Sequence, residues 1–203
     1  MQDVETTLAD VVRGLYARGW APAWSGNYSF RGDDGAIRIS RTGVDKSRFA
    51  ATDFLTVNLD GSSFDPNAPA PSAETPLHLA VYRLFDDARF VLHVHTTVNT
   101  VLSRLYTEKI VFSGFELQKS FAGQTTHEAT LTLPVFVNSQ DTSSLARQIE
   151  DYYRRRRCDL PGFLLSGHGL YVWGRTLEET LRHLEAFEFL LTCKWEMKKS
   201  GFE

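Results

Sequence analysis

Cysteine is scarce in this chain of 203 residues, which contains only Cys158 and Cys193. The two lie in different segments and match neither a zinc-binding spacing nor a redox pair. We therefore expect reduced thiols, as in a cytoplasmic protein, and no disulfide framework. Neither cysteine is a candidate metal ligand.

Long apolar runs are also missing. No segment approaches the roughly 20 residues needed to cross a bilayer, and residues 1–25 lack the continuous apolar core of a secretory signal. Neither sign of charge dominates, because the formal net charge is only −3. We expect neither a membrane nor a nucleic acid as partner. The hydrophobic fraction, 42%, is sufficient for the core of one domain spanning residues 1–203.

The order of predicted helices and strands indicates the fold class. Helical spacing of apolar residues predicts helices over residues 4–18, 72–85, 97–105 and 144–157, and a last one that follows the capping box at Thr176. Short apolar runs predict strands over residues 27–31, 36–41, 109–112 and 130–137, and a hairpin of residues 163–165 and 170–173. This order favours a mixed sheet covered by helices over strict strand–helix alternation.

Two histidines separated by one residue are the most informative feature. His93 and His95 lie in an apolar run, and alternate residues of a strand point to the same face. Two neutral imidazoles side by side suit Zn²⁺, and His168, flanked by glycines in the hairpin turn, offers a third ligand. Histidines on apolar strands are also common as hydrogen-bonded core residues, so spacing alone leaves both interpretations open.

Two glutamates are candidates for proton transfer beside such a metal. Glu116 follows a glycine turn and stands between Phe115 and Leu117, surroundings that we expect to raise the pKa of its carboxyl. Glu74 lies at the start of a predicted helix, where free backbone amides stabilise a carboxylate. Taken alone, each is more often a solvated or capping residue.

Three short polar segments are candidates for holding an anion. They are Ser25-Gly26-Asn27, Arg41 to Lys46 and Pro71-Ser72. Each combines hydroxyl or amide side chains with backbone that a ligand can approach closely. None has the glycine pattern of a nucleotide-binding loop, so we expect no dinucleotide or ATP cofactor. Singly, each segment is more often a turn.

These motifs together resemble those of the class II aldolase/adducin family, from about Leu8 to Met197. The landmarks are Ser25-Gly26-Asn27, Thr42-Gly43, Pro71-Ser72-Ala73-Glu74-Thr75, His93-Val94-His95-Thr96, Phe112-Ser113-Gly114-Phe115-Glu116 and His168-Gly169-Leu170-Tyr171-Val172-Trp173-Gly174. Their order favours the metal interpretation of the histidines. The resemblance implies a three-layer α/β/α fold around a central mixed, mainly antiparallel sheet.

The resemblance also implies roles for the candidate residues. One Zn²⁺ per subunit would be bound by His93, His95 and His168. Glu116 matches the acid/base of the family's dehydratases and Glu74 that of its sugar-phosphate aldolases, so the division of roles stays open. A phosphate-binding role is implied for Asn27, Thr42, Gly43, Lys46 and Ser72.

The implied reaction is the dehydration of 5-methylthioribulose 1-phosphate in methionine salvage. The alternative is a class II aldolase or epimerase acting on another ketose phosphate. A third interpretation, an adducin-like interaction module without activity, requires a lost metal site, whereas all three histidines are present.

Two further expectations concern assembly and metal identity. The resemblance implies a homo-oligomer, a tetramer by analogy, although the sequence does not reveal the interface. The native metal stays open, because imidazole sites also accept Fe²⁺, Co²⁺ or Mn²⁺.

Overall fold

The computed structural model describes residues 4–58, 60–65, 67–156 and 160–201. Cys158 lies outside the described residues, and Cys193 is a free thiol. Among the helices that the structure describes, none combines the length and the apolar character needed to cross a bilayer.

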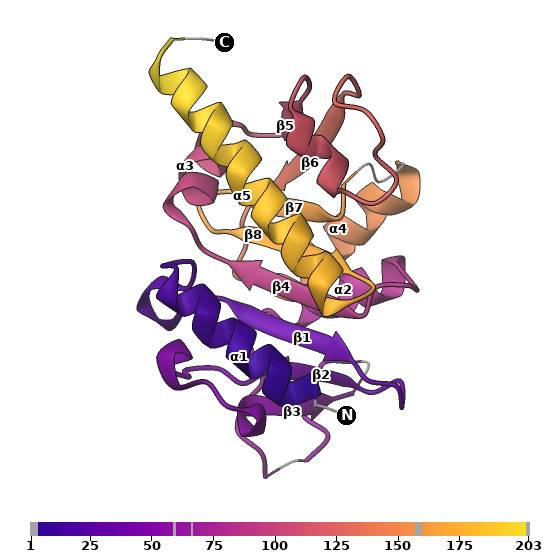
Figure 1. The fold of residues 1–203 in the computed structure, drawn as a ribbon. Coiled ribbons are helices and arrows are strands. Elements are labelled where there is room, and N and C mark those ends of the chain that lie inside the picture. The colour runs from indigo at the N-terminus through magenta and orange to yellow at the C-terminus, as the bar shows by residue number, and fades with distance from the viewer. Residues whose placement is uncertain (1–3, 59, 66, 157–159, 202–203) are drawn as a thin grey trace.

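A central sheet of eight strands runs through the molecule (Figure 1). Its strands are β1 (Asn27–Arg31), β2 (Ile37–Ser40), β3 (Phe54–Val57), β4 (Phe90–Val94), β5 (Lys109–Phe112), β6 (Leu131–Phe136), β7 (Gly162–Leu165) and β8 (Leu170–Gly174). They are ordered β3-β2-β1-β4-β8-β7-β6-β5. Only β6 and β7 pair in parallel, so the sheet is mixed and mainly antiparallel, as predicted.

Helices cover both faces of this sheet. They are α1 (Val4–Ala17), α2 (Thr75–Leu84), α3 (Thr97–Leu105), α4 (Thr142–Arg155) and α5 (Leu177–Lys199). One core cluster joins the sheet to α1, α3 and α5, and a second joins the opposite face to α2 and α4. The three-layer α/β/α prediction is confirmed.

Side-chain caps determine where α4 and α5 begin. Thr176 accepts a hydrogen bond from the Glu179 amide, as the capping box predicted for α5. At α4, Asp141 accepts a hydrogen bond from the Ser144 amide, so the helix begins at Thr142, two residues before the predicted start.

The segment before α2 differs more from the prediction. Ser72 to Glu74 form a turn, in which the Glu74 amide donates to Ser72 Oγ and the Thr75 amide to the Ser72 carbonyl. Helix α2 therefore begins at Thr75 and not at Ser72. This turn leaves the Glu74 side chain free to reach the sheet.

The strand register aligns three polar residues across the sheet. Asn27 of β1 pairs with His93 of β4, which pairs in turn with Tyr171 of β8. Directly paired residues project to the same face, and Tyr171 packs in the core cluster shared with α2 and α4. A polar row therefore crosses the centre of the sheet beneath α2.

Gly162 of β7 provides a test of the packing between the sheet and α5. A Cβ atom at Gly162 would lie 2.8 Å from both the Phe187 ring and the Tyr171 carbonyl oxygen. We expect Gly162→Ala to lower the free energy of unfolding by about 1–3 kcal/mol through overpacking. The control is Gly14→Ala on α1, where a Cβ meets nothing within 4 Å and where alanine stabilises a helix. Urea denaturation that gives both variants the same stability would contradict this packing.

Candidate active site

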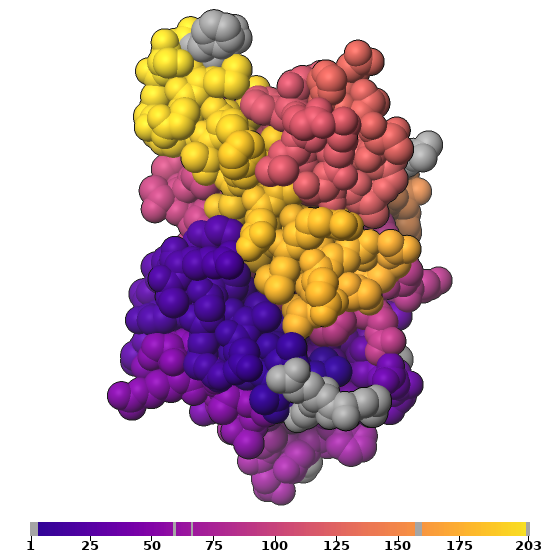
Figure 2. Space-filling view, viewed as in Figure 1, coloured from indigo at the N-terminus to yellow at the C-terminus, as the bar shows by residue number. Residues whose placement is uncertain are grey.

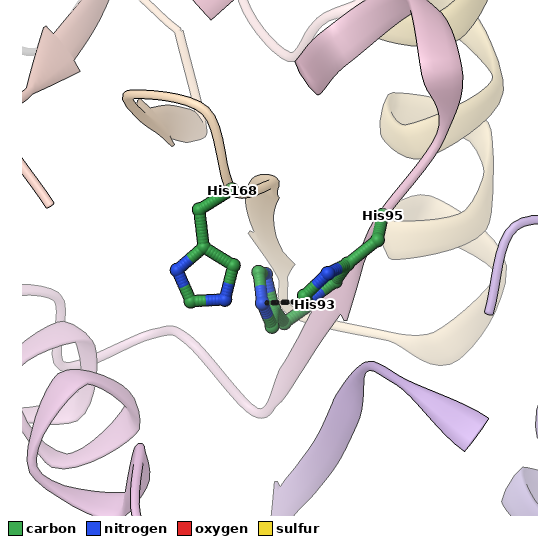
Figure 3. A group of neighbouring side chains, drawn as sticks. All are labelled: His93, His95 and His168. Atoms are coloured by element: carbon green, nitrogen blue, oxygen red, sulfur yellow. Dashed lines mark hydrogen bonds between the residues drawn. The ribbon is translucent and has the colours of Figure 1, made fainter. Parts of the chain in front are cut away.

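Three histidines from two parts of the sheet converge where β4 ends, beside the polar row (Figure 3). His93 lies on β4, His95 directly follows that strand, and His168 lies in the turn between β7 and β8. One ring nitrogen of each residue lies within 4.8 Å of those of the other two. The structure thus brings together all three histidines singled out by the sequence.

Hydrogen bonds on the outer side of the cluster orient two of the rings. His93 Nδ1 lies 3.0 Å from the Leu170 carbonyl oxygen, to which it must donate, so its Nε2 carries the lone pair. In the same way, His168 Nδ1 lies 3.3 Å from Asn138 Oδ1, which can only accept, so the ring donates from Nδ1. Such outer partners fix the tautomer of metal-binding histidines.

The inner nitrogens lie close enough together to share one cation. His95 Nε2 lies 2.7 Å from His93 Nε2 (Figure 3), and two lone pairs at that separation repel each other unless a proton or a cation intervenes. Three neutral imidazoles suit a divalent metal that prefers nitrogen ligands. The cluster therefore fits such an ion.

Burial keeps His93 and His95 neutral. It lowers the pKa of His93 to about 4. It also lowers the pKa of His95 to about 2, with a further contribution from the neighbouring His93 and His168 rings. Because only neutral imidazole binds a metal, both rings are ready to act as ligands near pH 7.

Glu74 is the carboxylate nearest to this cluster. Its Oε2 lies 3.2 Å from His93 Nε2, and its Oε1 lies 3.0 Å from His168 Nε2. Asn27 Nδ2 and the Tyr171 hydroxyl both donate to Oε2, at 2.7 and 2.5 Å. Burial raises the pKa of Glu74, but the His93 and His168 rings and the hydrogen bond from Asn27 outweigh it, so the pKa lies well below its usual range. An ionised oxygen ligand or base therefore borders the histidines.

Tyr171 is a site residue that the sequence did not single out. Its ring stacks on His93 with centroids 3.9 Å apart. Burial and the nearby Glu74 carboxylate raise its pKa well above the usual value, so the hydroxyl stays a donor. The only sequence signal was its place in the predicted strand of residues 170–173, which does not specify a partner.

Glu116 lies elsewhere. It begins the short 3₁₀ helix η4 (Glu116–Ser120), which packs on α5 and thus belongs to the layer opposite α2. The space-filling view shows the pink to salmon segment around residues 110–130 at the surface beside α5 (Figure 2). Among the described contacts of the Glu116 carboxylate, none is with His93, His95 or His168. The carboxylate pairs instead with Lys119 and His127.

The expected pKa of Glu116 was therefore wrong. Its side chain is 73% exposed, and the hydrogen bond from Lys119 lowers its pKa instead of raising it. Apolar neighbours in sequence do not bury the carboxylate, because Leu117 is itself exposed.

Two of the candidate phosphate residues, Asn27 and Ser72, contact Glu74 directly, and Thr42 and Gly43 follow a neighbouring β-bridge. The antiparallel β-bridge between Arg41 and Pro71 sets Thr42 against Ala70, to whose carbonyl the Thr42 amide donates, and Ser72 against Ser40. Gly43 has a φ of +71°, which favours glycine. Asn27 completes the group through its hydrogen bond to Glu74.

Lys46 does not join this group. Only 2% of it is exposed, and its Nζ lies 3.3 Å from the Val44 carbonyl oxygen and 5.5 Å from the centre of the Phe49 ring. No described contact links its ammonium group to Asn27 or Ser72.

A family model described as the class II aldolase and adducin N-terminal domain matches residues 6–195. This chain belongs to the class II aldolase and adducin family. A methylthioribulose-1-phosphate dehydratase of Citrobacter koseri is 48% identical over 195 residues, which cover 96% of this chain and 95% of that one. One of Stenotrophomonas maltophilia is 44% identical, with 98% and 93% of the two chains covered.

Solved structures support the same fold. An L-fuculose 1-phosphate aldolase superposes with a TM-score of 0.80 at 22% identity, covering 99% of this chain and 89% of its own. An L-fuculose-1-phosphate aldolase from Thermus thermophilus gives 0.74 at 24% identity, with 96% and 95% covered. The class II aldolase-like architecture is thereby confirmed.

A second buried carboxylate, that of Glu188, contacts Thr96, the residue after His95. Glu188 of α5 accepts hydrogen bonds from Thr96 Oγ1 at 2.8 Å and from Asn99 Nδ2 at 3.0 Å. Thr96 follows His95 and caps α3. Glu188 is only 6% exposed, and burial raises its pKa to about 7.

This raised pKa predicts a pH-dependent stability. The folded chain binds the Glu188 proton more tightly than the unfolded chain, so the stabilisation is present below about pH 4.5 and is lost as the pH rises through about 7. Glu188→Gln does not titrate. From pH 4.5 to 8, we expect the stability of the wild type relative to that variant to fall by about 2–3 kcal/mol, measured by urea denaturation. A difference that stays constant with pH would contradict the burial of this carboxyl.

Proposed function

We propose that this chain dehydrates 5-methylthioribulose 1-phosphate to 2,3-diketo-5-methylthiopentyl 1-phosphate, a hydro-lyase reaction of methionine salvage. The observation that carries the proposal is the near full-length identity, 42–48%, to relatives named for this activity. The convergence of His93, His95 and His168 supports it, because the reaction needs an electrophilic centre beside a ketone.

Zinc is the metal that we propose for the three histidines, one ion per subunit. Neutral imidazoles leave the charge of a bound Zn²⁺ undiminished, and the ion supplies the Lewis acidity that polarises the substrate carbonyl. Glu74 borders the same position and balances part of this charge.

The substrate phosphate is assigned to the polar group beside Glu74. Asn27, Thr42, Gly43 and Ser72 offer amide, hydroxyl and backbone donors to phosphate oxygens. Lys46 would join them only if its ammonium group left the Phe49 ring.

Glu116 remains our proposed acid/base. Its carboxylate removes the C3 proton and then protonates the C4 hydroxyl, which departs as water; the resulting enol tautomerises to the diketone. Because Glu116 is exposed and belongs to the opposite helical layer, we propose that another copy of the chain supplies it, in a cytoplasmic homo-oligomer such as a tetramer. Glu74, already beside the histidines, is the second candidate for this role.

An aldolase or epimerase reaction on another ketose phosphate is the second candidate function. It is favoured by one observation, the ionised Glu74 held directly beside the cluster. Product analysis separates the two, because dehydration gives one product that is lighter than the substrate by one water, an epimerase gives an isomer of unchanged mass, and an aldolase releases a two-carbon or three-carbon fragment.

Metal removal tests the proposed chemistry. We expect a chelated sample to lose turnover of 5-methylthioribulose 1-phosphate and to regain it when one equivalent of Zn²⁺ per subunit is restored. Metal content is measured on the same samples. Equal turnover by the chelated and reloaded samples would rule out the assigned role of the histidines.

Mixed oligomers test the origin of the acid/base. Glu116→Gln is expected to keep the metal and lose turnover, whereas His95→Ala is expected to lose both. If the two variants are co-expressed, about a quarter of the sites in random oligomers combine intact histidines with Glu116 of another copy, and activity reappears. A mixture as inactive as its parents would show that Glu116 does not act between copies. Full activity of Glu116→Gln alone would transfer the role to Glu74.

A further inference from the structure

A chain of buried hydrogen bonds leads from Glu74 into the protein. Glu74 Oε2 accepts from Asn27 Nδ2 at 2.7 Å, and Asn27 Oδ1 lies 2.5 Å from His78 Nε2. His78 Nδ1 lies 2.7 Å from Ser29 Oγ, which lies 2.8 Å from the Tyr82 hydroxyl. His78, Ser29 and Tyr82 are buried, and the proposed chemistry uses none of them.

Regular secondary structure makes these contacts possible. Asn27 and Ser29 are alternate residues of β1 and project to one face. His78 and Tyr82 are one turn apart on α2, so they face the strand as a matching pair. Arg31 anchors the far end, donating to the Tyr82 carbonyl at 2.7 Å while its guanidinium lies over the Tyr82 ring.

The direction of each hydrogen bond in this series follows from the Glu74 carboxylate, which can only accept and therefore faces the Asn27 amide nitrogen. Asn27 Oδ1 can only accept, so His78 Nε2 must donate to it. A neutral imidazole then accepts at Nδ1, so the Ser29 hydroxyl donates to His78 and the Tyr82 hydroxyl donates to Ser29. Burial lowers the pKa of His78 to about 4, which keeps the ring neutral.

This direction matters at Asn27, because an amide can rotate by half a turn at little cost. In the rotated state, Oδ1 would face the Glu74 carboxylate and two acceptors would meet, while the amide nitrogen would face a donor at His78. The Glu74 carboxylate and the His78 donor therefore favour the same orientation, in which the amide donor points toward Glu74.

We propose that His78 is a positioning residue, whose Nε2–H group fixes the Asn27 amide so that its donor serves Glu74 and the phosphate site. The inference rests on the proposed function for its kinetic readout.

Two uncharged variants separate positioning from simple packing. Glutamine can place its amide nitrogen near the position of His78 Nε2 and keep the donor to Asn27, whereas asparagine reaches only the position of Nδ1. We expect His78→Asn to lower kcat/KM roughly 10- to 100-fold, as loss of an outer hydrogen-bond partner does. We expect His78→Gln to stay within about threefold of the wild type, with zinc content unchanged in both. Equal impairment of the two variants, or none in His78→Asn, would overturn the proposal.

A double-mutant cycle provides the second readout. If His78 acts only through Asn27, His78→Asn lowers kcat/KM no further in an Asn27→Ala background. An undiminished decrease in that background would mean that His78 acts by another route, which would overturn the proposal. Circular dichroism and the urea midpoint confirm that each compared variant is folded.

A spectroscopic measurement tests the inference without the reaction. In the zinc-loaded protein labelled with ¹⁵N-histidine, the resonance missing from His78→Gln identifies His78. It should report a neutral ring protonated at Nε2 from pH 8 to 5, and an Nδ1-protonated ring would overturn the inference even if dehydration is observed. If the wild type fails to dehydrate the substrate, the proposed function fails while the tautomer of His78 is still decided.

Discussion

The close approach of the His168 turn to the end of β4 is the constraint on which the site depends. A Cβ atom at Gly169 would lie 2.4 Å from the Val94 carbonyl oxygen and 2.7 Å from the His93 ring. Only a residue without a side chain lets β8 begin this close to β4. That contact sets His168 opposite two histidines that the strand period has already aligned.

The other site residues lie either beside His93 in the sheet or above the sheet, in the turn before α2. Along the sheet, the pairing of β1, β4 and β8 sets Asn27 and Tyr171 on either side of His93. Above the sheet, the turn before α2 brings Glu74 down onto the same row, where Asn27 and Tyr171 donate hydrogen bonds to it and the His93 and His168 rings border it. The two donors stabilise the buried carboxylate, which would be costly to bury in isolation.

The sequence predicted the parts of the site that depend on local periodicity or on a single glycine. His93 and His95 follow from the strand period, and His168 from its flanking glycines. The sequence did not predict that Glu116 is exposed, because the apolar neighbours of a residue do not determine which side chain faces solvent. Tyr171 depends on strand register, and His78 on partners 51 and 49 residues away on β1. Lys46 illustrates the same limit, since its burial against Phe49 arises from tertiary packing.

The link between Glu188 and Thr96 has a mechanical consequence. Because α3 begins directly after His95 and its capping residue is bonded to α5, the second histidine is carried by a packed pair of helices and not by a loose connection. Any sliding of the C-terminal helix along the sheet would be transmitted to that imidazole. The longest helix that the structure describes, which packs on the face of the sheet opposite the polar row, thus limits how accurately the three imidazole rings can meet.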